Sequence, residues 1–360
     1  MTNTIIKKEK DWNYFEFKDI FDLIQRGKRL TKSNQIPGKI PYVSSSAQKN
    51  GVDGFIGNDF GVRKFSNCLT IANSGSVGAT FFHPYEFIAS DHVTVLKSSK
   101  MNNYIYIFIS NLLSRLNEKY HFNREINDFR IKREKIMLPI DHHGAPDWLF
   151  METKGKIIFE NKFQSLLKYI EPKIKELEHD LKGSSDMTLV GVEWNSYEIN
   201  TFFIFNRVKG LSETNYVKGD HPFVSTSSIN NGISAFVKAD VKHLTKGNSL
   251  TINPITGKAF YHGHDFVGRG GAGSSIYELH EQNLTKYSGL FISMMLSNSA
   301  ESKASFGVQL NGERLKKTKF LLPSKNGKPD WEFMEQYMKL IELKKLKQLY
   351  SYIISKIKNN

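Results

Sequence analysis

The sequence predicts an α/β (α+β) architecture of two tandem domains, each followed by a long helix. The two helices are expected to pair as an antiparallel coiled coil with pseudo-two-fold symmetry. Three observations predict this: the chain repeats itself, short strand patterns fill most of each half, and an amphipathic helix pattern closes each half. The 360 residues are enough for two or three domains with separate cores.

Segments of the first half return in the second half in the same order. Residues 146–152 read PDWLFME, and residues 329–335 read PDWEFME. The segment PYVS at residues 41–44 returns as PFVS at 222–225, and LTI at 69–71 returns unchanged at 250–252. Unrelated segments that share a few aromatic residues are the alternative, but they would not keep one order and a nearly constant spacing.

Short apolar or alternating runs broken by Gly, Asn and Ser predict strands in each domain. The clearest strands are expected at residues 40–43, 68–72, 92–96, 221–224 and 249–252, and helices at 104–116 and 286–296. A Pro-Asp pair then opens each long helix, with Asp147 and Asp330 as N-caps for the free N–H groups of the first turn. The predicted boundaries are 1–146 and 184–329 for the domains, and 147–183 and 330–360 for their helices.

The two closing helices carry apolar residues at alternating steps of three and four, which is the spacing of a coiled-coil seam. Such a seam needs an apolar partner helix of similar length, so the two helices are expected to pack on each other. Pro172 is expected to kink the first helix because it removes a main-chain hydrogen bond. The seam residues are Phe163, Leu167, Ile170, Ile174, Leu177 and Leu181 in the first helix and Leu346, Tyr350, Ile353 and Ile357 in the second.

The chain is basic, with 50 Lys and Arg against 36 Asp and Glu, a formal net charge of +14. This excess favours a polyanionic partner, and nucleic acid is favoured over a membrane because no basic amphipathic anchor is evident. No apolar run approaches the roughly 18 residues that a membrane-spanning helix needs. Cys68 is the only cysteine, which excludes an internal disulfide and makes a reducing cytoplasm the expected location.

Loops at matching places in the two halves combine hydroxyl, amide and basic side chains. A protein that reads a DNA duplex needs Lys and Arg for phosphates and Ser, Thr, Asn, Gln or Arg for base edges. A tight Asn-Gly turn explains only part of each run, although any one lysine is more simply a solvated charge. The candidate DNA-binding residues are Lys28, Arg29, Ser44, Ser45, Ser46, Gln48, Lys49, Asn50, Arg63 and Lys64 in the first half and Ser225, Thr226, Ser227, Asn230, Asn231, Lys258, Arg269, Ser274 and Ser275 in the second.

Taken in order and in both copies, these motifs resemble the DNA-specificity (S) subunits of type I and type IIB restriction–modification systems. The residues that carry the resemblance are the aromatic opening Trp12, Tyr14, Phe17 and Phe21, the segments 27–30, 40–44, 50–52, 69–72 and 75–78, and the closing segments 130–139 and 314–323. The resemblance implies two target-recognition domains, each binding one half-site of a bipartite double-stranded DNA target in the major groove. Paired helices of about 30 residues, about 45 Å long, would then span about 13 base pairs.

The resemblance also implies a non-catalytic subunit without a cofactor of its own. Methylation and cleavage, with S-adenosylmethionine and Mg²⁺, would belong to methyltransferase (modification) and restriction subunits that dock on the outer helix faces and flanking domain surfaces. The PDWxFME helix opening looks more like the type IIB relatives. In the second half, residues 256–259 replace the turn at 75–78, and a Gly-rich loop is inserted at 268–273. Base-reading residues therefore cannot be copied from one half to the other.

Two other functions stay open from the sequence alone. A stand-alone metal-dependent nuclease would use Asp147, Glu152 and Lys154, which match a PD…ExK pattern. On a helix, however, the two carboxylates lie about 140° apart and cannot share an ion, and the second copy has Tyr337 in place of the lysine. A decoy module would bind the partner subunits through the same helices and would show no preference among DNA sequences.

Further motif matches suggest metals or cofactors but are incomplete. His262, His264 and Asp265 have no additional ligand at a suitable spacing. The Gly-rich loop at residues 268–273 fits the dinucleotide fingerprint, yet no βαβ unit surrounds it. We therefore expect no catalytic residue, no metal and no cofactor in this chain.

Overall fold

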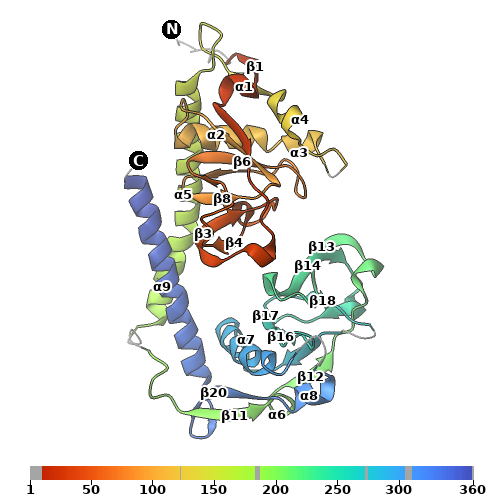
Figure 1. The fold of residues 1–360 in the computed structure, drawn as a ribbon. Helices are drawn as coiled ribbons and strands as arrows, with labels where there is room; N and C mark the ends of the chain where they lie inside the picture. The colour runs from red at the N-terminus through yellow and green to blue at the C-terminus, as the bar shows by residue number, and fades with distance from the viewer. Residues whose placement is uncertain (1–9, 122, 183–186, 272–274, 305–309, 359–360) are drawn as a thin grey trace, which may run out of the picture. The chain divides into compact units, whose positions relative to one another are not determined.

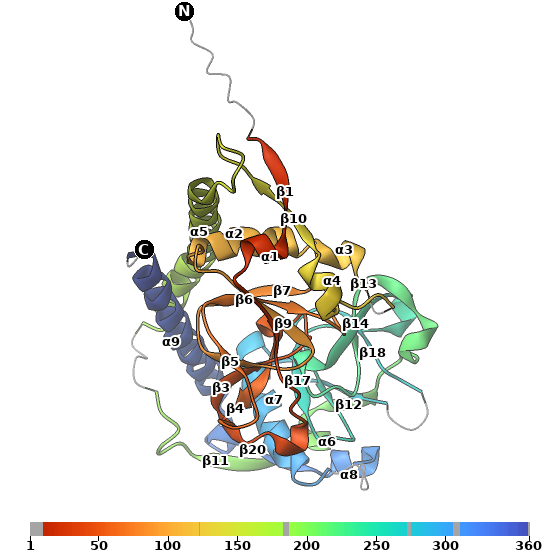
Figure 2. The same cartoon turned by 45° about the horizontal axis from the view of Figure 1, so that its top comes forward.

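The order of strands and helices in the first half of the chain returns in the second half (Figures 1 and 2). The computed structural model describes residues 10–121, 123–182, 187–271, 275–304 and 310–358. It divides into two compact units, Met1–Leu167 and Lys168–Asn360. The predicted boundary at residues 183 and 184 lies outside the described residues.

Three sheets form the first unit, in the orders β2-β9-β6-β7, β4-β3-β8-β5 and β1-β10. The strands are β1 (Trp12–Glu16), β2 (Leu23–Arg26), β3 (Pro37–Val43), β4 (Val52–Ile56), β5 (Lys64–Phe65), β6 (Cys68–Ala72), β7 (Thr80–His83), β8 (Phe87–Ala89), β9 (Val93–Lys97) and β10 (Lys135–Pro139). The helices are α1 (Phe17–Ile20), α2 (Asn103–Leu113), α3 (Leu116–Lys119), α4 (Asp128–Lys132) and α5 (Trp148–Asp180), of which α5 continues into the second unit.

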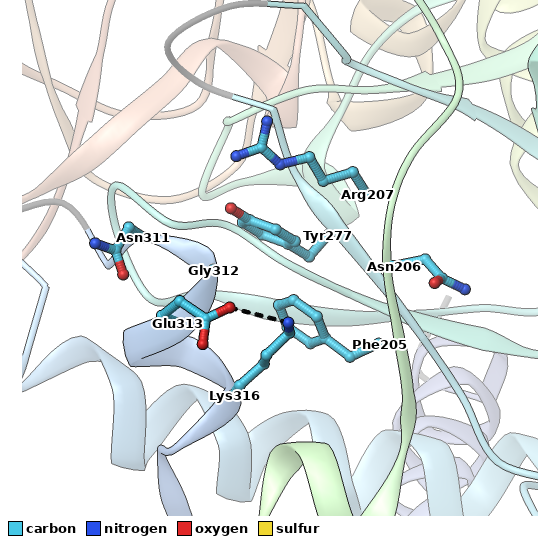
Figure 3. Close-up of a pocket in the computed structure, with 8 residues that line it drawn as sticks. All are labelled: Phe205, Asn206, Arg207, Tyr277, Asn311, Gly312, Glu313 and Lys316. Carbon is cyan, nitrogen blue, oxygen red and sulfur yellow. Dashed lines mark hydrogen bonds and ion pairs between the residues drawn. The ribbon is translucent and has the colours of Figure 1, made fainter.

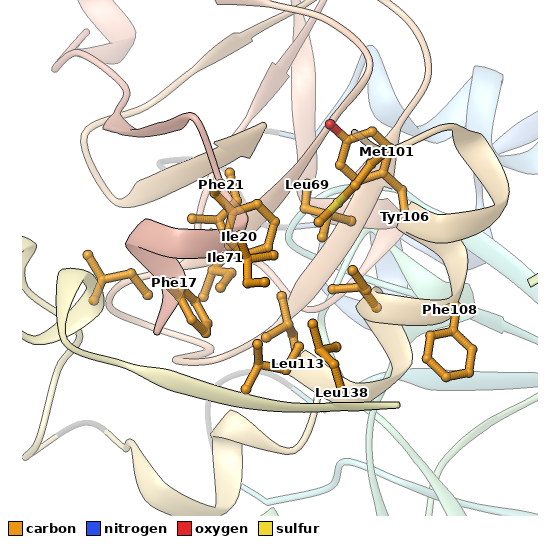
Figure 4. Close-up of a cluster of buried hydrophobic side chains, with 14 of the residues drawn as sticks. Phe17, Ile20, Phe21, Leu69, Ile71, Met101, Tyr106, Phe108, Leu113 and Leu138 are labelled. Atoms are coloured by element: carbon orange, nitrogen blue, oxygen red, sulfur yellow. The ribbon is translucent and has the colours of Figure 1, made fainter. Parts of the chain in front are cut away.

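Strand β6 is buried on both of its faces, which explains its apolar composition. Leu69 and Ile71 point to one side and share a core with Leu113 of α2 (Figure 4). Cys68 belongs to a second core with Phe87 of β8, between the two four-stranded sheets. The prediction of a strand at residues 68–72 is confirmed, and a strand covered on two sides needs little polar surface.

The second unit repeats this plan with sheets in the orders β12-β19-β16-β17, β14-β13-β18-β15 and β11-β20-β21. The strands are β11 (Trp194–Glu198), β12 (Ile204–Arg207), β13 (Val217–Val224), β14 (Ile233–Lys238), β15 (Leu244–Thr245), β16 (Ser249–Ile252), β17 (Ala259–His262), β18 (Phe266–Gly268), β19 (Tyr277–His280), β20 (Lys319–Lys325) and β21 (Lys328–Pro329). The helices are α6 (Ile199–Phe202), α7 (Lys286–Glu301), α8 (Gly312–Lys316) and α9 (Trp331–Lys358).

The core of the second unit follows the same logic as that of the first. Leu250 and Ile252 of β16 pack with Phe291 and Leu296 of α7. The outer strand pairs also agree in register, because β1 pairs with β10 and β11 with β20 in antiparallel ladders of matching position. The strand predicted at residues 249–252 and the mixed α/β class are both confirmed.

The helix predicted at residues 104–116 is wrong at its C-terminal end. Helix α2 starts one residue after Asn102, whose side chain accepts hydrogen bonds from the N–H groups of Tyr104 and Ile105, both at 3.1 Å. It ends at Leu113, and a separate short helix, α3, begins at Leu116. Ser114 and Arg115 lie between them, a break that the apolar pattern did not indicate.

Both long helices begin with the expected aspartate caps. Asp147 Oδ1 accepts from the N–H of Phe150 at 2.9 Å, and Asp330 Oδ1 accepts from the N–H of Phe333 at 2.9 Å. Helix α5 has 33 residues and runs without interruption through Pro172, and α9 has 28. Within the described residues no helix has an apolar stretch of the length that crossing a lipid bilayer requires.

The part of α5 that belongs to the second unit packs against α9. Asp180 binds Lys339 at 2.8 Å, and Glu178 binds Lys347 at 2.6 Å, so earlier residues of one helix meet later residues of the other. The two helices are therefore antiparallel here. The apolar cluster between them contains Leu177, Leu181, Leu340 and Leu343, with Ile174 and Leu346 at its edge.

The remaining seam residues are also shielded from solvent. Leu167, Ile170 and Ile353 are buried. Phe163, Tyr350 and Ile357 are partly buried. The predicted seam left out the first half of α9, where Leu340 and Leu343 are buried against α5.

Candidate nucleic-acid interface

The two serine-rich loops are hairpin connections with the same internal hydrogen bonds. In the first unit the N–H of Ser44 donates to the carbonyl of Gly51 at 2.8 Å, and in the second the N–H of Ser225 donates to Gly232 at 2.8 Å. Asn50 and Asn231 have φ values of 54° and 53°, the left-handed region that Asn and Gly tolerate best. The Asn-Gly pair therefore serves the turn between β3 and β4 and between β13 and β14.

Some hydroxyl groups of these loops are occupied by the loop itself. Ser46 Oγ accepts from the N–H of Gln48 at 3.1 Å, and Ser227 Oγ accepts from the N–H of Ile229 at 3.3 Å. Ser225 Oγ donates to the carbonyl of Gly232 at 3.2 Å. These serines shape the loop, and they hold its outer residues toward solvent.

Amide and lysine side chains of the loops are available to a ligand. They are exposed, and within the described residues their side chains have no hydrogen-bond partner. An exposed amide can pair with adenine at two points, and a lysine can meet a phosphate or guanine. These residues are Gln48, Lys49 and Asn50 in the first unit and Asn230 and Asn231 in the second.

The basic candidates of the first unit fall into two groups. Lys28 and Arg29 are exposed directly after β2, where the N–H of Lys28 is bound to the carbonyl of Ala89 at 3.0 Å. Arg63 Nη1 donates to the carbonyl of Arg26 at 2.6 Å beside the same loop, and no carboxylate of the described residues pairs with it. Lys64, in contrast, forms an ion pair with Asp59 at 2.5 Å within its own domain.

In the second unit the structure brings Arg269 to the serine-rich loop. Its Nη1 donates to Thr226 Oγ1 at 3.1 Å, and its main-chain N–H donates to the carbonyl of Val224 at 2.8 Å. Lys258 lies away from this group in an ion pair with Glu301. Ser275 Oγ donates to the carbonyl of Gly271 at 2.6 Å, and Ser274 lies outside the described residues.

The residues of the nuclease alternative serve helix α5. Asp147 caps the helix and also binds Lys10 at 2.5 Å. The hydrogen bond from Lys10 holds the pKa of this carboxyl below its usual range. Lys154 lies over the Phe150 ring, 5.4 Å from its centroid. Asp147 and Lys154 therefore each have a local structural contact.

Two of the residues considered for a metal, His262 and Asp265, are engaged in separate contacts. His262 is buried, and its Nε2 lies 2.9 Å from Thr251 Oγ1. Burial lowers its pKa to about 4. Asp265 instead binds Lys246 at 2.8 Å and the N–H of Gly247 at 2.9 Å. Among the residues that the structure describes, no three or more His, Cys, Asp or Glu side chains gather as metal ligands.

Sequence reasoning missed a cavity of about 420 Å³ in the second unit (Figure 3). It lies where β12, β19 and α8 meet. Arg207 is exposed at this cavity, whereas the matching Arg26 of the first unit is bound to Asp128 at 2.7 Å. The repeat carries the signal that could have found it, because Gly312 stands where the first half has Asp128. Its lining includes Phe205, Arg207, Tyr277, Asn311, Glu313 and Lys316.

Several known proteins are similar to this chain over most of its length. A curated relative, described as "Type II restriction enzyme BgcI specificity subunit S.BcgI" of Heyndrickxia coagulans, is 26% identical over 353 residues, which cover 95% of this chain and 96% of the relative. Among solved structures, the type I restriction–modification S subunit from M. genitalium gives a TM-score of 0.46 at 16% identity, with 97% of this chain and 94% of that chain covered. The HsdS subunit from Thermoanaerobacter tengcongensis gives 0.31 at 12% identity, covering 98% and 93%.

The family described as type I restriction modification DNA specificity domain matches the chain twice, at residues 9–169 and 191–350. The two matches leave only short segments uncovered, and they correspond to the two copies of the strand and helix order. The chain therefore belongs to the type I restriction modification DNA specificity domain family and carries two copies of that domain.

Proposed function

We propose that this chain is the non-catalytic DNA-specificity subunit of a restriction–modification complex. The observation that carries the proposal is the pair of specificity domains, each presenting its own hairpin loop with exposed amide and basic side chains. Two different loops on two copies of one scaffold suit a bipartite target, with one half-site for each domain. The helices α5 and α9 then belong to the part that sets the unspecified gap between the half-sites.

Phosphate contacts supply affinity in this proposal, and the loop residues supply the choice of sequence. Lys28, Arg29 and Arg63 are exposed at the loop that follows β2, and their charges can bind the phosphates of the duplex. Gln48 and Arg269 suit base edges, since both can form two hydrogen bonds to one base. If about half of the net charge of +14 faces phosphates, binding has a log–log salt slope of about −6.

Methylation and cleavage belong, in this proposal, to partner subunits that bring S-adenosylmethionine and Mg²⁺, and the complex works in the cytoplasm. The outer faces of the helices suit the docking of a methyltransferase subunit. Tyr169 of α5 is 71% exposed and Tyr352 of α9 is 54% exposed. Large apolar side chains on a surface helix are typical of protein interfaces.

Two single substitutions test the assignment of one half-site to each domain. Gln48→Ala alters the first domain, and Arg269→Gln alters the second. Each variant, bound to the methyltransferase subunit, is measured on duplexes that carry every base at each target position. We expect each variant to lose about 1–3 kcal/mol of discrimination within one half-site, and a different one in each case. Loss in the same half-site for both, or in neither, would refute the assignment.

A further inference from the structure

We propose that Arg207 and the cavity beside it bind a phosphate group of the DNA backbone, a contact that the first domain lacks. This inference rests on the proposed function and adds to it a residue and a type of ligand. It comes from a difference between the two copies of one fold. An arginine at the same place in the repeat forms an ion pair in the first domain and lies beside a cavity in the second.

The strands around Arg26 and Arg207 pair in the same way in the two domains. Arg26 ends β2 and lies opposite Thr94 in the antiparallel ladder with β9. Arg207 ends β12 and lies opposite Tyr277 in the ladder with β19. The two arginines therefore occupy the same place in the repeat.

The short helix that faces each arginine also begins in the same way. Asn127 Oδ1 accepts from the N–H of Arg130 at 2.8 Å, and Asn311 Oδ1 accepts from Arg314 at 2.9 Å. The residue after this cap is Asp128 in α4 and Gly312 in α8. The first residue of the helix is therefore where the two domains differ.

The first domain neutralises its own arginine. Arg26 Nε lies 2.7 Å from Asp128 Oδ1, and Arg26 Nη2 donates to the carbonyl of Ile126 at 2.9 Å. Arg207 has no carboxylate within ion-pair distance among the described residues. Its guanidinium carbon lies 5.8 Å from the centroid of the Tyr277 ring, which supports the side chain without neutralising it.

The cavity beside Arg207 has room and charge for an anion. It measures about 420 Å³, and Gly312, which has no side chain to fill it, lies in its wall (Figure 3). The second cation of the lining, Lys316, is already bound to Glu313 at 3.0 Å. The net charge of the site therefore comes from Arg207, and a guanidinium matches the oxygens of a phosphate as it matches a carboxylate.

A phosphate fits this site better than a base does. Tyr277 is only 5% exposed, and its ring stacks on Phe205 with centroids 4.7 Å apart. Arg207 lies over the same tyrosine, so the Tyr277 ring offers no open face on which a base could stack. A phosphate needs no such face.

The cavity is also connected to the proposed DNA-binding surface. The N–H of Val208, next to Arg207, donates to the carbonyl of Ile276 at 3.5 Å, and the N–H of Ile276 donates to the carbonyl of Arg269 at 3.1 Å. Two main-chain hydrogen bonds thus join the neighbourhood of Arg207 to Arg269, which itself binds the Thr226 loop. We therefore expect a duplex held by that loop to bring a phosphate close to Arg207.

The test is the salt dependence of DNA binding by the full chain together with its methyltransferase subunit. Affinity is measured over a range of salt concentrations on the selected target duplex and on an unrelated duplex. We expect Arg207→Gln to reduce the magnitude of the log–log slope by about 0.9. Because the contribution of one phosphate contact vanishes near 1 M salt, this change in slope corresponds to about fivefold weaker binding at about 0.15 M salt. The factor should be the same for both duplexes.

Two further variants control for a general effect of lost positive charge and for misfolding. Gly312→Asp restores the carboxylate of the first domain and should reproduce the effect of Arg207→Gln. A Cβ at this position would lie 3.0 Å from the Tyr277 hydroxyl oxygen, so the melting temperature of this variant is measured alongside. The double variant Arg26→Gln with Asp128→Asn removes the neutral pair of the first domain and should leave the slope unchanged.

The outcomes separate this inference from the proposed function. If the unaltered complex selects a sequence but Arg207→Gln keeps its slope, the phosphate contact is refuted and the proposed function stands. A change in base preference at one position would mean that Arg207 reads a base, which also refutes it. Stabilisation by inorganic phosphate that is lost in Arg207→Gln, with an unchanged DNA slope, would assign the site to a free anion instead. If the unaltered complex selects no sequence, the proposed function itself fails.

Discussion

A buried histidine in each domain should make the protein sensitive to mild acid. His262 of β17 is only 7% exposed, its Nε2 lies 2.9 Å from Thr251 Oγ1, and its ring lies 4.5 Å from that of Phe266. Burial lowers its pKa to about 4. His83 of the first domain has the same kind of surroundings, and burial lowers its pKa to about 4 as well.

The sign and size of the effect follow from proton linkage. The unfolded chain binds a proton to histidine near pH 6.5, whereas the folded domain resists it down to about pH 4. The stabilising contribution is therefore fully present above pH 6.5 and is lost as the pH falls toward 4. When the pH falls from 7 to 5, His262 alone should lower the unfolding free energy of the second domain by about 2 kcal/mol. The complete loss, reached below pH 4, is about 3 kcal/mol.

Hydrogen exchange of the amides in β16 and β17 measures this locally, since the chain contains two units that need not unfold together. The variant His262→Gln keeps a group that can bond to Thr251 but does not titrate. We expect its loss of protection between pH 7 and pH 5 to be about 2 kcal/mol smaller than that of the unaltered chain. The matched control is His264→Gln, an exposed histidine two residues away that should change nothing. An unchanged pH dependence in His262→Gln would refute the reasoning.

Three further substitutions are expected to act through contacts described above. Leu177→Ala should lower the unfolding free energy of the second unit by about 2–5 kcal/mol in urea, because Leu177 is fully buried between the helices, while the exposed Glu171→Ala should not. Asp330→Ala should remove the cap of α9 and cost about 1 kcal/mol in the same assay, and an unchanged midpoint would contradict the cap. Lys28→Gln should reduce the salt slope of DNA binding by about 0.9, and Lys64→Gln by less, because a carboxylate of its own domain already pairs with Lys64. Equal effects of the two lysines would contradict this distinction.

Local patterns in the sequence predicted the elements whose structure depends on near neighbours. The caps at Asp147 and Asp330 follow from the Pro-Asp pairs, and the strands β6 and β16 follow from short apolar runs. The repeat itself predicted two domains, because two copies of one pattern give two copies of one fold.

Features that depend on residues far apart in the chain were out of reach. Lys258 was a candidate for phosphate binding, but it pairs with Glu301, which α7 brings to it across the fold. The pattern of apolar residues likewise does not predict the break between α2 and α3. The cavity at Arg207 was not predicted either: an alignment of the two copies shows that Gly312 stands where the first copy has Asp128, but it does not show that Arg207 lies beside that position.

The central claim is that this chain selects a DNA sequence in two separate blocks. The most direct test is a selection from randomised duplexes by the full chain bound to its methyltransferase subunit, at about physiological salt. We expect enrichment of one sequence with two short specified blocks and an unspecified gap between them, and loss of one block when one domain is exchanged for that of a relative. Salt-sensitive binding without any enriched sequence would contradict the account and would leave only a basic scaffold.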